Sequence, residues 1–174
     1  MLNIIAIIGI VVVVSVLVSA AVKPSTFRVQ RTTTIKAAPE KIVPLIEDFR
    51  TWRSWSPYEK LDAAMRRHLS GAPKGKGSVY AWAGNAKSAA GRMEIIDTSS
   101  SQVTIQLDFI KPFEGHNITE FKFEPKGDST NVTWAMHGPS PYFAKIATTF
   151  FNMDRMLGND FETGLANLKA IAER

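Results

Sequence analysis

The apolar positions at the start of the chain follow one another without interruption. Residues 1–22 contain no charged side chain and are mostly isoleucine, valine, leucine and alanine. A helix of about 20 such residues rises about 30 Å, which is the thickness of the hydrocarbon core of a bilayer. This pattern predicts a transmembrane anchor over residues 1–23, with residues 2–22 in the membrane, and a short linker over residues 24–26.

A cleaved signal peptide is the alternative for this segment. Val18, Ser19 and Ala20 would provide a small-residue cleavage site near Ala20. However, no lysine or arginine precedes the apolar run, and the run is longer than the apolar region of a signal peptide. The anchor is therefore the preferred interpretation, and the protein is expected to be a single-pass membrane protein.

Basic residues lie only on the C-terminal side of the apolar run, beginning with Lys23, Arg28 and Arg31. Lysine and arginine near a span tend to remain on the cytoplasmic side. We therefore expect the rest of the chain to face the cytoplasm; cleavage near Ala20 would instead give an exported protein.

After the linker the pattern changes to short elements. Residues 27–36 are rich in β-branched side chains, which indicates a strand. Pro39 is suited to the first turn of a helix, and apolar residues at spacings of three and four predict a helix over residues 39–50. The aromatic-dense residues 52–58 predict a further brief helical turn.

From residue 65 apolar and polar positions alternate, with glycine and proline between the runs. Alternation with period two predicts about six antiparallel strands up to Gly138. The last 30 or so residues follow helical spacing and predict one long helix with a continuous apolar stripe. The stripe consists of Ile146, Phe150, Met153, Leu157, Phe161, Gly164, Leu168 and Ile171.

This order of elements predicts an α+β domain over residues 27–174. A curved antiparallel sheet of six to seven strands must cover its apolar face, and only the terminal helix is long enough to do so. Such a helix-grip arrangement tends to leave a cavity between sheet and helix. The formal net charge of +5 suits a surface beside anionic headgroups, and the absence of cysteine excludes a disulfide-stapled domain.

Five segments together resemble the SRPBCC (START-like) superfamily, and within it the polyketide cyclase/dehydrase and lipid-transport-like branch. They are IKAAPEKI (35–42), DFRTWRSWSP (48–57), GSVYAW (77–82), VTWAMHGP (132–139) and DFETGLANL (160–168). The resemblance extends over residues 27–173. It implies the helix-grip fold and a ligand cavity, whereas activities within that superfamily differ widely.

The cavity that the resemblance implies would be lined by inward-facing strand residues and the terminal helix. The candidate ligand-binding residues are Trp55, Tyr80, Trp82, Met93, Asn117, Thr119, Phe121, Trp134, Met136, Phe150 and Met153. Phe121, Trp134, Phe150 and Met153 are better explained as core. The polar atoms of Tyr80, Trp82, Asn117 and Thr119 need partners when buried, which a ligand or water could supply.

No residue pattern favours a metal, a cofactor or a catalytic nucleophile. His116 and His137 fall out of phase with the apolar strand positions, and without cysteine the supply of metal ligands is thin. Basic residues are not clustered with exposed aromatic residues, which argues against nucleic acid as a partner. The sequence leaves the oligomeric state open.

The function expected from these observations is binding of a hydrophobic small molecule or lipid without catalysis. A polyketide cyclase/dehydrase-type enzyme, with Tyr80 or Asn117 as hydrogen-bond donors to a carbonyl, is one alternative. A protein-interaction module is another. Because residues 23–26 reach at most about 14 Å, the domain is expected to lie almost on the bilayer, which favours a membrane-partitioned ligand.

Overall fold

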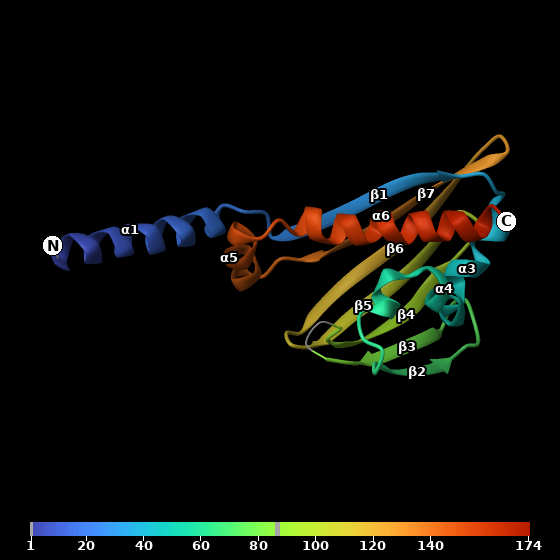
Figure 1. Ribbon diagram of the computed structural model, residues 1–174, viewed down its shortest axis with the longest axis horizontal. Coiled ribbons are helices and arrows are strands. Elements are labelled where there is room, and N and C mark those ends of the chain that lie inside the picture. The colour runs from blue at the N-terminus through green and yellow to red at the C-terminus, as the bar shows by residue number, and fades with distance from the viewer. Residues whose placement is uncertain (1, 86–87) are drawn as a thin grey trace.

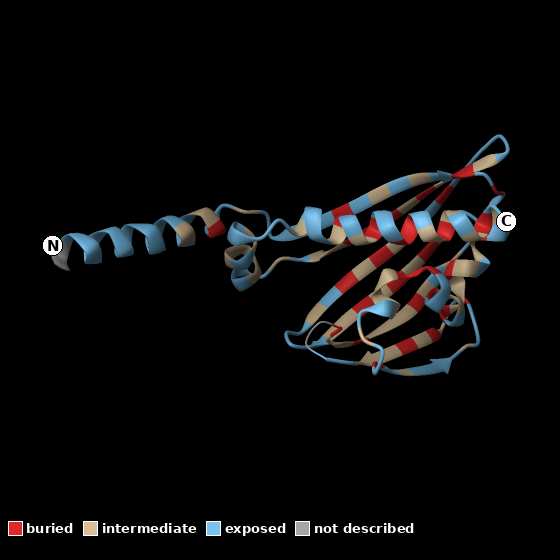
Figure 2. Cartoon of the chain, viewed as in Figure 1, coloured by how far each residue is buried: buried red, intermediate tan, exposed pale blue. Residues whose placement is uncertain are grey.

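The computed structural model describes residues 2–85 and 88–174. Helix α1 (Leu2–Ala21) extends away from the rest of the chain at one end (Figure 1). Its apolar side chains are exposed along most of its length, as Figure 2 shows. Among the described residues α1 alone is long and apolar enough to cross a membrane, a property that a signal sequence shares. The predicted N-terminal apolar helix is therefore present.

The remaining chain forms a seven-stranded antiparallel sheet with the order β1-β7-β6-β5-β4-β3-β2. Its strands are β1 (Thr26–Ile35), β2 (Arg66–Gly71), β3 (Ser78–Ala83), β4 (Ala90–Thr98), β5 (Gln102–Lys111), β6 (Gly115–Lys126) and β7 (Ser129–Pro139). The six strands after residue 65 pair in sequence order, and β1 pairs with β7. The predicted antiparallel sheet is confirmed.

Helix α6 (Met153–Ala172) lies along the sheet over β1 and β7 (Figure 1). The Asn152 side chain caps the helix by accepting a hydrogen bond of 2.9 Å from the backbone N–H of Arg155. Phe161, Leu165 and Leu168 are almost fully buried on the side that faces the strands. The α+β helix-grip fold is thus confirmed.

The predicted helix over residues 39–50 is broken into short pieces. They are α2 (Pro39–Ile42), α3 (Pro44–Glu47) and the 3-10 turn η1 (Phe49–Thr51). The brief helical turn predicted over residues 52–58 is present as α4 (Trp52–Trp55) and the 3-10 turn η2 (Pro57–Lys60). Pro44 has no backbone N–H to continue the first helix, and it begins the second. The Asp48 carboxylate then accepts the N–H of Arg50, which starts η1. These pieces pack against α6, β3 and β6 and cover part of the inner face of the sheet that α6 leaves free.

The predicted continuous terminal helix is wrong in its first third. Helix α5 (Tyr142–Phe150) ends before Phe151, whose backbone is extended, and α6 begins after the Asn152 cap. The break turns α5 away from the sheet and toward α1. Phe150 is therefore 67% exposed and does not continue the apolar stripe of α6.

Aromatic rings fill the space where α6 crosses the sheet. Trp134 of β7 stacks on Phe161 of α6 with ring centroids 4.3 Å apart and an interplanar angle of 11°. The ring centroid of Phe121, on the neighbouring strand β6, lies 5.0 Å from that of Trp134. The ring centroid of Trp55, on α4, lies 5.6 Å from that of Trp134. Gly164 permits this approach, because a Cβ there would lie 2.6 Å from the Trp134 ring.

A partly exposed ion-pair cluster attaches β1 to α6. Arg31 points from β1 under the helix, where its guanidinium donates to Glu162 at 2.7 Å and to Asp154 at 3.0 Å. Both carboxylates are more than half exposed, whereas Arg31 is 24% exposed. The guanidinium passes over Gly158, where any Cβ would collide with it.

Replacing Gly158 by alanine is expected to destabilise the domain by about 0–1 kcal/mol, because the new Cβ displaces the flexible Arg31 guanidinium from its ion pairs with Asp154 and Glu162. In an ordinary helix the same change stabilises by about 1 kcal/mol, so the sign of the change in unfolding free energy shows whether Arg31 lies against Gly158. Chemical unfolding of the full chain in detergent, followed by circular dichroism, measures it. In an Arg31→Ala background, Gly158→Ala should become neutral or stabilising. A stabilising effect with Arg31 present would contradict the close approach.

Candidate ligand-binding site

The inner face of the sheet has an apolar surface at the end next to α1, where β3 and β5 end and β4 begins. Trp82, Met93 and Phe109 face inward there and are only partly buried. Gly91 of β4 lies opposite both Trp82 and Phe109, so these two side chains flank a position without a side chain. Their rings lie 6.0 Å apart and nearly perpendicular. We call this region the α1 end of the concave face.

Two polar side chains border this surface on β6. Asn117 is 9% exposed and Thr119 is 4% exposed. Within the described part of the chain neither side chain forms a hydrogen bond with another residue, and the polar atoms of both remain accessible to solvent. The Asn117 carboxamide lies over Gly138 of the neighbouring β7, where no side chain competes for the space. Largely buried polar groups are normally hydrogen-bonded, so a ligand or water is expected to supply the partner.

Tyr80 has a protein partner instead. Its hydroxyl donates to the carboxylate of Glu59 in η2, and Arg67 of β2 donates from Nε to the same carboxylate at 2.7 Å. The Glu59 side chain is 6% exposed and that of Arg67 is 17% exposed. Burial, followed by the hydrogen bond to Glu59, raises the pKa of the Tyr80 hydroxyl. The phenol is neutral, and its proton is not free for a substrate carbonyl.

Trp82 is also satisfied by the protein. Its Nε1–H donates to the carbonyl of Ser88 at 2.9 Å, which fixes the indole above β4. One ring face stacks toward Tyr80, with centroids 6.2 Å apart. The indole therefore offers an apolar surface rather than a polar handle.

Trp55, Phe121 and Trp134 belong to the packed aromatic core. Trp55 Nε1 donates to the carbonyl of Leu45 at 2.8 Å, whereas Trp134 Nε1 is buried without a partner among the described residues. Met136, 6% exposed, lies opposite Thr119 and joins this core to the α1 end.

Phe150 and Met153 are the two candidates on either side of the break between α5 and α6. Phe150 lies on α5, away from the concave face, because that helix turns toward α1. Met153 is the first residue of α6 and is partly buried. The expectation that Phe150 lines the ligand site is therefore corrected.

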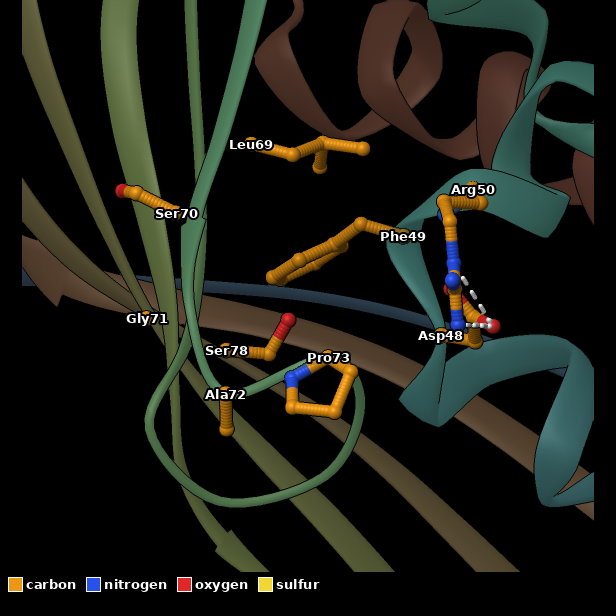
Figure 3. Close-up of a pocket in the computed structure, with 9 residues that line it drawn as sticks. All are labelled: Asp48, Phe49, Arg50, Leu69, Ser70, Gly71, Ala72, Pro73 and Ser78. Atoms are coloured by element: carbon orange, nitrogen blue, oxygen red, sulfur yellow. Dashed lines mark hydrogen bonds and ion pairs between the residues drawn. The ribbon is translucent and has the colours of Figure 1, made fainter.

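Two surface pockets lie at the opposite end of the domain. The first, about 160 Å³, lies between η1 and the β2–β3 hairpin (Figure 3). Asp48 and Arg50 form a two-bond pair at its rim, and Phe49 and Leu69 are apolar walls. The second, about 330 Å³, lies between α2–α3 and the β4–β5 turn. Neither pocket is lined by a sequence-predicted site residue. Drug-sized ligands usually occupy about 300–1,000 Å³, so the first pocket is too small for one and the second is at the lower limit.

Sequence reasoning missed several residues of this region. Phe109 has the same inward strand phase as Leu107, so alternation alone could have indicated it. Glu59 and Arg67 come together only because η2 folds over the edge of the sheet, for which the sequence has no local signal. His116 pairs with Asp108 at 2.8 Å on the outer face, as its strand phase predicts.

Comparisons with known proteins identify the fold. The sequence profile described as polyketide cyclase/dehydrase and lipid transport matches residues 26–173. No curated protein matches the chain. Protein CV1439 from Chromobacterium violaceum is 14% identical with a TM-score of 0.59, covering 87% of this chain and 99% of its own. Protein SA2116 from Staphylococcus aureus, of unknown function, is 12% identical with a TM-score of 0.62, covering 85% and 94%.

A third solved structure comes from a biosynthetic locus. DynU16, a putative protein of the dynemicin biosynthetic locus, is 14% identical with a TM-score of 0.56. The match covers 84% of this chain and 47% of DynU16. At these identities the likeness establishes a shared fold.

Proposed function

Because the chain belongs to the polyketide cyclase/dehydrase and lipid transport family, we propose that it is a membrane-tethered domain that binds a hydrophobic small molecule or lipid without catalysis. The site is the α1 end of the concave face. The ligand packs its apolar part against Trp82, Met93 and Phe109. Its polar group is hydrogen-bonded by Asn117 and Thr119.

The unpaired carboxamide of Asn117 is the observation that carries this proposal. A nearly buried amide beside partly buried apolar side chains is the combination that apolar ligand sites use to orient a ligand. An amide can accept and donate, so a carbonyl, hydroxyl or ester group would satisfy it. A wholly buried core would leave no reason for a polar side chain at this position.

The tether is part of the proposal. The apolar helix α1 ends at Ala21, and β1 begins at Thr26, so few residues separate a membrane span from the sheet. We place residues 1–23 in the membrane as an anchor and residues 24–26 as the linker. A domain held this close to the bilayer meets lipids and membrane-partitioned molecules at high local concentration.

The catalytic alternative receives less support. Of its two expected hydrogen-bond donors to a carbonyl, Tyr80 already donates to Glu59. Asn117 alone can orient a carbonyl, and orientation without a proton donor or base serves binding better than chemistry.

Native mass spectrometry of the full chain, extracted from membranes in mild detergent, tests the proposal. We expect a retained small-molecule or lipid adduct whose population falls about tenfold in Asn117→Ala and in Met93→Ala, the loss of about 1.4 kcal/mol of contact. Because the Asn117 side chain has no hydrogen-bond partner among the described residues, Asn117→Ala should fold normally.

The matched control is Leu69→Ala, which removes a 46% exposed apolar side chain at the distal pocket. Lipid that binds along the surface of α1 instead would give the same adduct population in the wild type and in all three variants. Equal adduct populations in the wild type and in both site variants would count against the concave face as the binding site.

A further inference from the structure

Large aromatic side chains are exposed on one side of the domain, around α5 and the β5–β6 turn. Such patches on soluble proteins usually mark a binding surface. The patch, which we call the aromatic rim, consists of Phe113, Tyr142, Phe143, Phe150 and Phe151, each 47–69% exposed. Phe113 of the turn and Phe143 of α5 lie 5.5 Å apart, so the rim joins two elements that are distant in sequence.

The rim lies beside the C-terminal end of α1, between that helix and the sheet (Figure 1). The Tyr142 hydroxyl donates to the carbonyl of Leu17 at 2.8 Å. Lys23 Nζ donates to the carbonyl of Lys145 at 3.1 Å and to Thr149 at 3.0 Å. Helix α5 is therefore held against the last turn of the apolar helix.

This position corresponds to the boundary of a bilayer that α1 would span. Leu17 lies four residues before the end of α1 at Ala21, which is about 6 Å along the helix. Interfacial helices bury their apolar face about 5–10 Å into the headgroup and acyl boundary. Phenylalanine is typical of the apolar face of such helices, and tyrosine is enriched at the membrane–water interface. The depth of α5 and the composition of the rim therefore both fit the headgroup and acyl boundary of a bilayer.

We propose that the aromatic rim inserts into the headgroup and acyl boundary of the lipid bilayer beside α1. The inference rests on the membrane tether of the proposed function and adds the orientation of the domain. Phe109, of the α1 end of the concave face, and Phe113 belong to the same β5–β6 hairpin. Docking of the rim thus holds the ligand site against the lipid surface, so a lipid-soluble ligand can enter without crossing bulk water.

Site-specific fluorescence in vesicles tests this orientation, because the chain has no cysteine to interfere. Single-cysteine variants Phe143→Cys and Phe150→Cys of the full chain are labelled with an environment-sensitive nitrobenzoxadiazole dye. They are reconstituted into phosphatidylcholine/phosphatidylglycerol vesicles with or without a lipid that is spin-labelled near the headgroup. We expect a blue-shifted emission at both positions and quenching at least about twofold stronger than at the control Ser100→Cys, in the exposed β4–β5 turn.

A fourth variant, Val12→Cys in α1, separates this inference from the tether itself. Position 12 lies mid-way along α1, so it is probed with a lipid that is spin-labelled near the end of its acyl chain. Quenching at position 12 by this lipid, with positions 143 and 150 as water-exposed as position 100, would overturn rim insertion and leave the anchor standing. No quenching at position 12 by this lipid would overturn the anchor, and the rim proposal with it. Protection of positions 143 and 150 from aqueous iodide without lipid quenching would show a protein partner and also overturn insertion.

Discussion

Replacing Trp134 by alanine is expected to lower the free energy of unfolding by about 3–5 kcal/mol, the cost of removing a large aromatic side chain from a packed core. Its ring is 2% exposed and contacts the rings of Phe161, Phe121 and Trp55. These partners come from α6, β6 and α4, so the cavity left behind cannot collapse without moving three elements. Chemical unfolding of the full chain in detergent, followed by far-ultraviolet circular dichroism, measures the loss.

Two further variants serve as comparisons for Trp134→Ala. Trp134→Phe should cost less than half as much, because it keeps a stacked ring and removes an indole N–H that has no partner within the described residues. Trp82→Ala, at a partly buried position, should also cost less. A loss below about 1 kcal/mol for Trp134→Ala would mean that the space around this ring is a true cavity, and the ligand site would then extend to α6.

Replacing Glu59 by alanine is expected to cost about 1–3 kcal/mol, because it leaves the partly buried guanidinium of Arg67 without the carboxylate that it pairs with. It also removes the acceptor of the Tyr80 hydroxyl. The effect is measured by the same unfolding experiment. The fold of η2 over the sheet edge should loosen, and amide hydrogen exchange between residues 57 and 67 should quicken.

The matched control is Asp128→Ala, which breaks an ion pair with Lys36 in which both side chains are about three-quarters exposed. Exposed pairs contribute about 0–1 kcal/mol. The double variant Glu59→Leu with Arg67→Met removes both charges and should recover most of the loss. If Glu59→Ala and Asp128→Ala cost the same, the Glu59 carboxylate is not buried against Arg67 in solution.

Much of the architecture could be predicted from local pattern. Strand alternation from Ser78 to Gly138 indicated the strands and their inward faces, because period two is a property of the extended backbone itself. The inward positions of Asn117 and Thr119 followed from the same alternation, and their lack of protein partners agrees with the expectation that a ligand or water completes them.

The two predictions that were wrong concern long helices that a short interruption divides, so that the chain changes direction there. Pro44 lies inside a helical pattern and divides it, and the two residues Phe151 and Asn152 end one helix and cap the next. Helical spacing continues through both interruptions, so periodicity alone joined the pieces. For this reason Phe150 was assigned to the wrong face of the molecule.

Sequence by itself determined the apolar N-terminal helix, the α+β class and the inward set of side chains, because these depend on composition and on the periods of helix and strand. Only the tertiary structure decided which inward residues are packed core and which remain open. That distinction depends on where α6 lies: over β1 and β7, where rings fill the space, and away from the α1 ends of β3, β4 and β5. The pairing of Glu59 with Arg67, and of α5 with α1, likewise required three dimensions, since each joins elements without any shared local pattern.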